Sequence, residues 1–536
     1  MIGPSERQAK RRGNSCARVW AYAGASALLM AACDPSPPEP SPAHDASSNA
    51  GEPAVAVIAA PAPADPVSPP TASTPSPTAR AQVTTRVDPR GARTALERAT
   101  LAQQGNATPP SEIRRANRAT MIYADAKFGS PFRGKLTHGE DFGVFERVEA
   151  SSGDRECRGE GWARIGVSAF ICLEHTSPSK RVPRELPVLG RGQLTPHYYA
   201  RVRRKNAAGE VPLAPRWASR SALAAGAEPL DHLQPDHDYA FERRRSSRNG
   251  TVLVDKAFRV VREADVRRLE PSGFAGRDVV VEPLPDEGRL AWSLEWPHAL
   301  IRAEPNLDAK IVGKAVHQSD FFVTDTAVRR RGVEWIAVAG ERPGWIAADE
   351  IRRWYPAPRP DKLGDEELWI DVELEQQTLA VMLGDAPLFV TMIASGNHKH
   401  PTPQGVFRIK TKMATSTMDS QAGDEEAYSV EGVPWAQFFH KRYGLHGTFW
   451  HNRFGRRTSH GCVNLSAKDA ALVYAMTAPD PLPGWAMAFA HDNAPGTVIR
   501  VRKMDAVVRD RRAVADAELN AEPEPEPEPD PVSARD

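Results

Sequence analysis

The sequence predicts a multidomain, mainly β protein with few helices, in which two small β-barrels precede a β-rich C-terminal unit. Three observations lead to this fold class. Short alternating apolar runs are separated by Gly, Asp and Pro turns through the central chain. Two of these stretches repeat one another. At 536 residues the chain is also too long for one hydrophobic core, so several units are expected.

The first element, residues 1–33, has the layout of an export signal. Basic residues precede an Ala-rich apolar stretch that is too short to span a bilayer comfortably. The stretch ends in Leu29-Met30-Ala31-Ala32-Cys33, which resembles the bacterial lipobox, although Met30 stands where Leu is usual. The resemblance implies that Cys33 is lipidated and anchors the protein to the inner or outer membrane. Ordinary cleavage nearby is the alternative.

The next element, residues 34–110, is rich in Pro, Ala, Ser and Thr and has no apolar periodicity that would support a core. We expect a disordered tether that reaches across the periplasm, at up to about 3.1 Å per residue where it is polyproline-like. At the other end, residues 503–536 contain a Glu-Pro and Asp-Pro run and are expected to form a disordered acidic tail.

The overall charge argues against nucleic acid as a partner. Lys and Arg nearly balance Asp and Glu, which leaves a net charge of +1. No global field therefore attracts a polyanion or an anionic membrane surface.

Residues 111–176 and 297–356 carry the internal repeat. Met121-Ile122-Tyr123-Ala124 aligns with Leu300-Ile301-Arg302-Ala303, and Asp141-Phe142 aligns without a gap with Asp320-Phe321. Both stretches resemble the bacterial SH3-like domain, which implies small β-barrels that contact peptidoglycan or peptides. A spacing role is equally open. The region between them, 177–296, has strand-like patches but no motif, so we expect a β-rich region of unknown role.

The C-terminal unit, residues 366–502, begins after a Pro-rich linker with alternating strands such as Leu368-Trp369-Ile370-Asp371-Val372. Two motifs follow in it. The first is Thr402-Pro403-Gln404-Gly405-Val406-Phe407, and the second runs from His446-Gly447 to Ser459-His460-Gly461-Cys462-Val463-Asn464.

A thiol needs a neighbouring base or cation to become a nucleophile at neutral pH. His446 and His460 are the local candidates beside Cys462. Gly461 allows a tight turn and close approach of a carbonyl group, and amides around Cys462 can receive an oxyanion. The pattern indicates acyl transfer.

The two motifs together resemble the L,D-transpeptidase (YkuD) family. The resemblance implies that Cys462 is the nucleophile and His446 the general base, with the Gly447 carbonyl orienting the His446 ring. It also implies that Ser459 and His460 shape the pocket, with oxyanion donors near Gly461. No cofactor and no metal are expected, because the His and Cys spacing matches no short zinc motif.

Four further residues are candidates for the groove that receives a peptide. Asn464 is interpreted as a structural or substrate-orienting amide. Tyr428, Trp450 and His451 could line the groove, although simple packing is the commoner role of such aromatic residues. Arg453, Arg456 and Arg457 could meet substrate carboxylates or form a solvated loop.

The cysteine count supports a special role for Cys462. Cys157 and Cys172 lie close together in one predicted domain, where they form either a disulfide or two buried thiols. Cys33 would be consumed by lipid. Cys462 is then left without an evident structural partner.

These observations predict an envelope-anchored, periplasmic L,D-transpeptidase that acts on peptidoglycan stem peptides. The acceptor stays open among a stem amine, water, which would make the protein an L,D-carboxypeptidase, and a protein lysine. The hypothesis from another class is a non-catalytic peptidoglycan-binding scaffold that uses the SH3-like repeats.

Overall fold

The structure is a computed structural model that describes residues 56–58, 109–148, 157, 159–203, 213–248, 250–340, 343–420 and 428–504. Predictions for the signal, for Cys33, for most of the tether and for the tail lie outside these ranges. Within the tether, β1 (Ala56–Ile58) pairs in parallel with β21 of a later unit. No helix among the described residues is long and apolar enough to cross a membrane.

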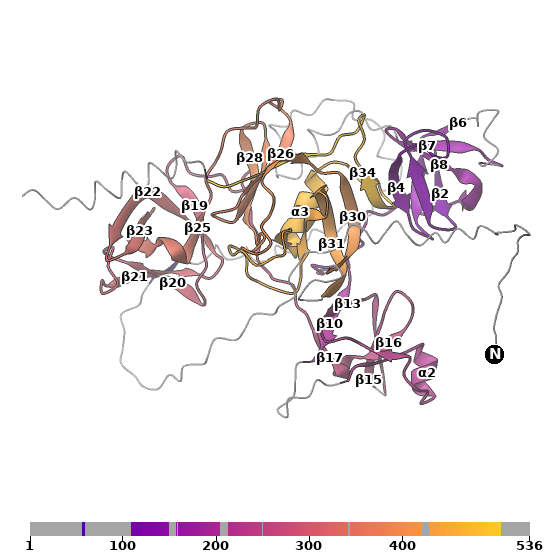
Figure 1. The fold of residues 1–536 in the computed structure, drawn as a ribbon, viewed down its shortest axis with the longest axis horizontal. Coiled ribbons are helices and arrows are strands. Elements are labelled where there is room, and N and C mark those ends of the chain that lie inside the picture. The colour runs from indigo at the N-terminus through magenta and orange to yellow at the C-terminus, as the bar shows by residue number, and fades with distance from the viewer. Residues whose placement is uncertain are drawn as a thin grey trace, which may run out of the picture.

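The predicted fold class is confirmed: the chain is mainly β, with three folded units around a central C-terminal unit (Figure 1). We call the three units that precede it unit 1 (112–178), unit 2 (198–268) and unit 3 (289–353). The strand β18 (Arg277–Asp278) lies between units 2 and 3.

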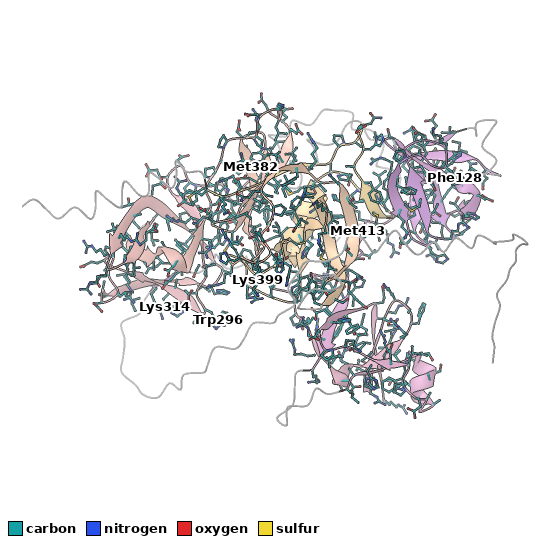
Figure 2. The ribbon with its side chains drawn as sticks, viewed as in Figure 1. Phe128, Trp296, Lys314, Met382, Lys399 and Met413 are labelled. Atoms are coloured by element: carbon teal, nitrogen blue, oxygen red, sulfur yellow. A yellow bond between two sulfur atoms is a disulfide. The ribbon has the colours of Figure 1, made fainter. Side chains whose placement is uncertain are left out.

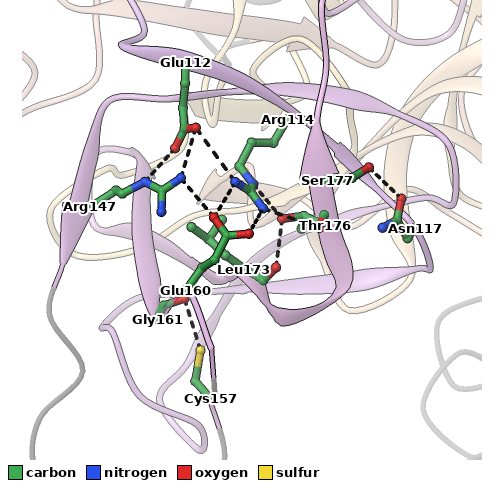
Figure 3. Close-up of polar contacts among 10 residues, drawn as sticks. All are labelled: Glu112, Arg114, Asn117, Arg147, Cys157, Glu160, Gly161, Leu173, Thr176 and Ser177. Atoms are coloured by element: carbon green, nitrogen blue, oxygen red, sulfur yellow. Dashed lines mark hydrogen bonds and ion pairs between the residues drawn. The ribbon is translucent and has the colours of Figure 1, made fainter.

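Unit 1 occupies the stretch that was predicted to form the first barrel. Its elements are β2 (Glu112–Ala116), β3 (Thr120–Tyr123), β4 (Phe132–Leu136), β5 (Asp141–Val144), β6 (Glu146–Val148), β7 (Trp162–Gly166), β8 (Ala169–Cys172), the 3₁₀ helix η2 (Leu173–His175) and β9 (Thr176–Pro178). Buried Arg114 binds both oxygens of Glu160 at 2.8 and 2.7 Å (Figure 3). Cys157 and Cys172 form a disulfide, which resolves the alternative left open by the sequence.

Unit 3 occupies the stretch that was predicted to form the second barrel. It contains β19 (Arg289–Ser293), β20 (His298–Arg302), β21 (Ile311–Val316), β22 (Asp320–Arg330), β23 (Val333–Val338), β24 (Gly344–Ala347), η4 (Ala348–Glu350) and β25 (Ile351–Arg353). In Figure 2, Lys314 and the exposed Trp296 mark the surface of this unit.

Unit 2 occupies the region to which no motif was assigned. It contains β10 (Tyr198–Val202), β11 (Pro215–Trp217), α2 (Arg220–Ala224), β12 (Asp231–His232), β13 (His237–Phe241), β14 (Arg243–Ser247), β15 (Gly250–Val254), β16 (Val260–Arg262), η3 (Glu263–Asp265) and β17 (Val266–Arg268).

All three units share one pairing pattern. The first strand pairs with two partners, namely β2 with β5 and β9, β10 with β13 and β17, and β19 with β22 and β25. The second strand also pairs with two partners, namely β3 with β4 and β8, β11 with β12 and β16, and β20 with β21 and β24. A 3₁₀ turn precedes the last strand each time. Where the sequence indicated two repeats, the structure therefore contains three units of one topology.

The C-terminal unit consists of two sheets and one helix. One sheet has the order β18, β28 (Ala386–Met392), β27 (Thr378–Leu383), β26 (Leu368–Glu373), β35 (Val498–Arg502) and β29 (Gly405–Arg408). The other contains β34 (Trp485–Phe489), β30 (Thr411–Asp419), β31 (Ser429–His440), β32 (Tyr443–Thr448) and β33 (Val463–Ser466). Apolar side chains of both sheets and of α3 (Ala467–Met476) form one core.

Local chemistry explains where α3 begins and ends. The Ser466 hydroxyl accepts the amide of Asp469 and caps the first turn. At the other end, the buried Lys412 ammonium donates to the carbonyls of Tyr474 and Thr477, both at 2.6 Å. Burial lowers the pKa of Lys412 to about 7.

Strand pairing attaches two of the preceding units directly to the C-terminal unit. The strand β34 pairs with β4 of unit 1, and the start of β31 pairs with β13 of unit 2. Unit 3 shares a hydrophobic cluster instead, in which Trp292 and Trp354 pack with Trp369 and Phe454. The C-terminal unit is thus extended at its edges by the units before it.

Candidate active site

Two neighbouring strands place the predicted nucleophile and base on one face of a sheet. The parallel strands β32 and β33 pair with Leu445 beside Val463 and His446 beside Asn464. Side chains alternate along a strand, so Leu445 and Val463 enter the main core while His446 and Asn464 face the other way. Cys462 precedes Val463 and lies in a different cluster, with Trp450 and Tyr428. Cys462, one residue before β33, and His446 therefore both lie on the side of the sheet where Trp450 packs.

The turn before Cys462 is held by Ser459. Its hydroxyl donates to the Cys462 carbonyl at 2.5 Å and accepts the Gly461 amide at 3.0 Å. Gly461 has φ +116°, and a side chain there would meet the Tyr443 ring. These bonds of Ser459 go to the backbone, so its positioning effect acts on the loop that carries the sulfur.

The Thr402 hydroxyl connects the two sequence motifs. It accepts the Gly396 amide at 2.9 Å and donates to the Gly461 carbonyl at 2.8 Å, and all three groups are buried. In a trans peptide, the carbonyl and the next N–H point in opposite directions. Because the Gly461 carbonyl faces Thr402, the Cys462 N–H points to the opposite side of the turn.

Replacing Thr402 by valine is expected to destabilise the protein by about 1 to 3 kcal/mol, because it leaves a buried donor and a buried acceptor without their hydroxyl. Thr402→Ser keeps the hydroxyl and is the matched control. Denaturant unfolding of both variants measures the difference. If Thr402→Val and Thr402→Ser unfolded at the same denaturant concentration, the hydrogen bonds of the Thr402 hydroxyl would contribute nothing to stability.

His446 is buried and its tautomer follows from its neighbour. Its Nδ1 lies 3.3 Å from the Gly447 carbonyl. A carbonyl oxygen only accepts, so Nδ1 carries the hydrogen and Nε2 of the neutral ring carries the lone pair. Trp450 stacks beside the ring at 5.8 Å. With its hydrogen on Nδ1, Nε2 is the nitrogen of His446 that could accept a proton.

Cys462 stays a thiol and is 1% exposed. Its Sγ lies 3.7 Å from the Arg442 carbonyl. His460 is partly exposed, and its ring lies 4.5 Å from the ring of His400 and 5.4 Å from that of Tyr428. A row of tilted rings therefore extends from the buried Tyr428 to the exposed His400.

Asn464 and His451 form a buried polar pair. The Asn464 amide lies 2.9 Å from His451 Nε2, while the Arg453 amide donates to His451 Nδ1 at 3.2 Å. Burial is the main cause that lowers the pKa of His451 to about 3, so the ring is neutral. With Nδ1 accepting, the hydrogen sits on Nε2, and Asn464 must present its Oδ1 to it.

This assignment fixes the other end of the Asn464 amide. As placed, Nδ2 of Asn464 faces His451, and Oδ1 is buried without a hydrogen-bond partner among the described residues. Because Nε2 of His451 must donate, the amide is assigned the other way round, which puts Oδ1 at His451 and the NH₂ group in the partnerless position. Asn464 shares its face with His446, so it carries an unsatisfied donor on the side of the sheet where Cys462 lies.

The low pKa of His451 predicts acid sensitivity. The unfolded chain takes up this proton near pH 6.5 and the folded chain only near pH 3, so stability is present above pH 6.5 and is lost as pH falls. Between pH 7 and 4 the wild type should lose roughly 3 kcal/mol more than His451→Gln. Asp469, whose pKa burial raises to about 6, acts in the opposite sense but equally in both proteins. Unfolding at several pH values is the measurement, and parallel curves would contradict the prediction.

Several neighbours of the site could not be recognised from the sequence. Tyr199 of unit 2 stacks on Phe449 at 3.6 Å, and its hydroxyl donates to the Gly432 carbonyl at 2.6 Å. Tyr428 and Trp450 are buried rather than lining an open groove. Unit 2 thus covers the aromatic side of the site, and no motif in its sequence signals this.

The arginines between the two halves of the motif have local partners. Arg457 donates to the Leu374 carbonyl and Arg456 pairs with Glu295 at 3.3 Å. The exposed His398 and His400 precede Thr402. Within the described ranges, no group of three or more His, Cys, Asp or Glu residues could hold a metal ion.

Comparison with known proteins identifies the C-terminal unit. Residues 367–501 match the family model of the YkuD L,D-transpeptidase catalytic domain, so this unit is a domain of that family. No curated protein matches the chain.

Solved structures of L,D-transpeptidases are similar to about a quarter to a third of the chain. An Enterococcus faecium enzyme is 23% identical, with 26% of this chain and 50% of that one covered and a TM-score of 0.21. The catalytic domain of an E. faecium enzyme is 24% identical over 26% and 98%, with a TM-score of 0.21. L,D-transpeptidase 3 from Mycobacterium tuberculosis is 17% identical over 34% and 91%, also at 0.21. The match thus spans half of the first of these chains.

Proposed function

We propose that this protein is an L,D-transpeptidase of the cell envelope that acts on peptidoglycan stem peptides through a thioester on Cys462. The observation that supports the proposal is that His446 of β32 pairs beside Asn464 of β33, with Cys462 directly before that strand, within the stretch that matches the YkuD catalytic domain. The donor is a tetrapeptide whose third residue, commonly diaminopimelate, is joined to a terminal D-alanine.

The first half-reaction transfers the acyl group to sulfur. His446 Nε2 takes the thiol proton, and Sγ attacks the carbonyl between the third residue and D-alanine. Backbone amides at the Gly461-Cys462 turn stabilise the oxyanion. His446 then gives the proton to the departing nitrogen, the C–N bond breaks, and D-alanine leaves as a free amino acid.

The second half-reaction restores the thiol. An acceptor amine attacks the thioester, loses its proton to His446, and displaces Cys462 with formation of a new amide. A side-chain amine of another stem makes a cross-link, and a protein lysine attaches that protein to the wall. Water as acceptor gives carboxypeptidase activity.

Within this mechanism, Asn464 is a substrate-orienting residue that His451 positions. The unsatisfied Asn464 NH₂ would donate to an acceptor oxygen of the bound peptide, and His451 holds the amide in that orientation. Ser459 and Thr402 act on the loop backbone. His460, beside Tyr428 and His400, would line the approach to the sulfur.

The test is to incubate the full protein with defined tetrapeptide muropeptides, with and without an acceptor amine, and to identify products by mass spectrometry. Released D-alanine together with a cross-linked dimer supports transpeptidation, whereas tripeptide alone supports carboxypeptidation. If neither acceptor gave a product, the enzymatic proposal would fail and the scaffold hypothesis would remain. Binding of the fragment 110–356 to sacculi then tests that hypothesis.

Attachment at Cys33 is part of the proposal, because lipidation at the lipobox-like sequence would hold the enzyme beside its substrate in the periplasm. Fractionation of the intact protein and of Cys33→Ser tests it. The wild type should sediment with one membrane, inner or outer, and the variant should be released. Membrane attachment of both proteins alike would contradict lipidation.

A further inference from the structure

Unit 2 contains a cavity of about 660 Å³, a size in the usual range for small-ligand sites. It lies between α2, the β14–β15 hairpin and the η3 turn. Its walls consist of arginines, hydroxyl groups and short apolar side chains: Arg203, Arg220, Leu223, Ala224, Ser247, Gly250, Thr251, Val252, Arg262, Glu263 and Ala264.

The same place in the repeat is hollow in unit 3 and filled in unit 1. A cavity of about 260 Å³ in unit 3 lies between the β20–β21 loop and the β22–β23 hairpin, and Arg330, Arg331 and Trp335 line it. In unit 1, Phe128 packs on Trp162 at this position, and the disulfide joins the β6–β7 connection to the end of β8. The shared topology therefore has one recurring position for a cavity. Aromatic side chains pack there in unit 1, whereas arginines line a cavity there in units 2 and 3.

The charges around the unit 2 cavity favour an anion. The Glu263 carboxylate already binds Arg244 at 2.8 Å through both oxygens and accepts the Tyr198 hydroxyl. The other nearby carboxyl group, Asp265, interacts with Arg262 and Arg203 from outside the lining. Three lining arginines and Arg244 thus face two carboxylates, which leaves positive charge in excess.

Two of the arginines are held in place by the fold. Arg262 lies over the Trp217 ring at 4.6 Å, and Arg203 donates Nε to the Ala264 carbonyl at 2.7 Å. Both are exposed, so their remaining N–H groups stay available. Planar guanidinium groups that are already oriented lose less freedom when they bind a carboxylate by two parallel hydrogen bonds.

We propose that this cavity binds a short acidic peptide with small apolar side chains, outside the active site. The arginines would take its carboxylates, while Leu223, Ala224 and Val252 contact its methyl groups, which a purely phosphate-bearing polymer would lack. The identification of this peptide as a second peptidoglycan stem rests on the proposed function. Such a site would hold the polymer against the enzyme independently of catalysis.

The experiment uses full-length Cys462→Ala, so that no turnover occurs, and the free tetrapeptide stem as the probe in calorimetric titration. Two sites per chain are expected. Combining Arg220→Ala with Arg262→Ala should remove one site or weaken it at least about tenfold, because each charged hydrogen bond is worth more than that factor. Arg243→Ala is the control, since this exposed arginine starts β14 outside the cavity.

Two further probes decide the chemistry. The same peptide with amidated carboxyl groups should lose the arginine-dependent site, and inorganic phosphate should not compete for it at similar concentration. Equal binding by the arginine double variant, or competition by phosphate, would overturn the acidic-peptide proposal. Catalysis by the double variant in an otherwise wild-type chain is measured separately. If the enzyme forms product but the titration shows no second binding site, this inference is wrong and the proposed function stands. If the titration shows the second site but no product forms, the proposed function is wrong and this binding site stands.

Discussion

Cys462→Ala is expected to abolish release of D-alanine from a tetrapeptide, with a fall of at least about 10⁴-fold in rate. Removal of the nucleophile eliminates the covalent path, and the remaining groups of the site cannot act as a unit without it. The measurement combines product analysis with the intact mass of the protein. The wild type should gain the mass of the acyl group when no acceptor is present, and the alanine variant should not.

Cys462→Ser is the matched control for this result. It keeps the size of the side chain and the hydrogen bond to the Arg442 carbonyl, but it replaces sulfur with a far less acidic nucleophile. The free energy of unfolding of both variants should lie within about 1 kcal/mol of the wild-type value. Undiminished product from the alanine protein would refute thioester catalysis at this position.

His446→Ala should lower the rate by about 10² to 10⁴-fold, the range for loss of a general base. His446 is buried, and the Gly447 carbonyl holds its Nδ1 hydrogen, so the side chain is oriented for proton transfer through Nε2. The acid limb of the rate against pH should also change, since the thiol of the variant must ionise unaided. Measurement of kcat/KM from pH 5 to 9 reports both effects.

His398→Ala provides the comparison for His446. His398 belongs to the same unit but is exposed on the loop before Thr402. It should retain the wild-type rate and pH profile. If the two alanine variants lost activity equally, His446 would have no special role as the base.

The β architecture followed from the sequence because alternation and turn residues are local signals. The C-terminal unit followed from two motifs, and the structure shows why both are needed: Thr402 of the first binds the Gly461 carbonyl of the second. That link spans many residues of chain, so spacing alone could not have indicated it. The disulfide was left open because pairing depends on distance, which the fold alone provides.

Unit 2 escaped recognition for a physical reason. Its pairing pattern is that of the other two units, but α2 and a long loop interrupt its second pair of strands, and β12 is only two residues long. A barrel tolerates such changes when inward-facing side chains stay apolar, as Leu253, Val261 and Phe241 do. Tyr199 was missed with it, because a contact to Phe449 depends on how the units pack.

The pairing of β34 with β4 has a practical consequence for any attempt to isolate the C-terminal unit. Cutting the chain before residue 366 removes the strand that covers β34 and uncovers Trp485, which packs with Ile122 and Leu136. The fragment would then present an open, apolar strand edge, which is a template for self-association. A soluble short version therefore requires a charged residue on β34, or the retention of unit 1 as its natural cover.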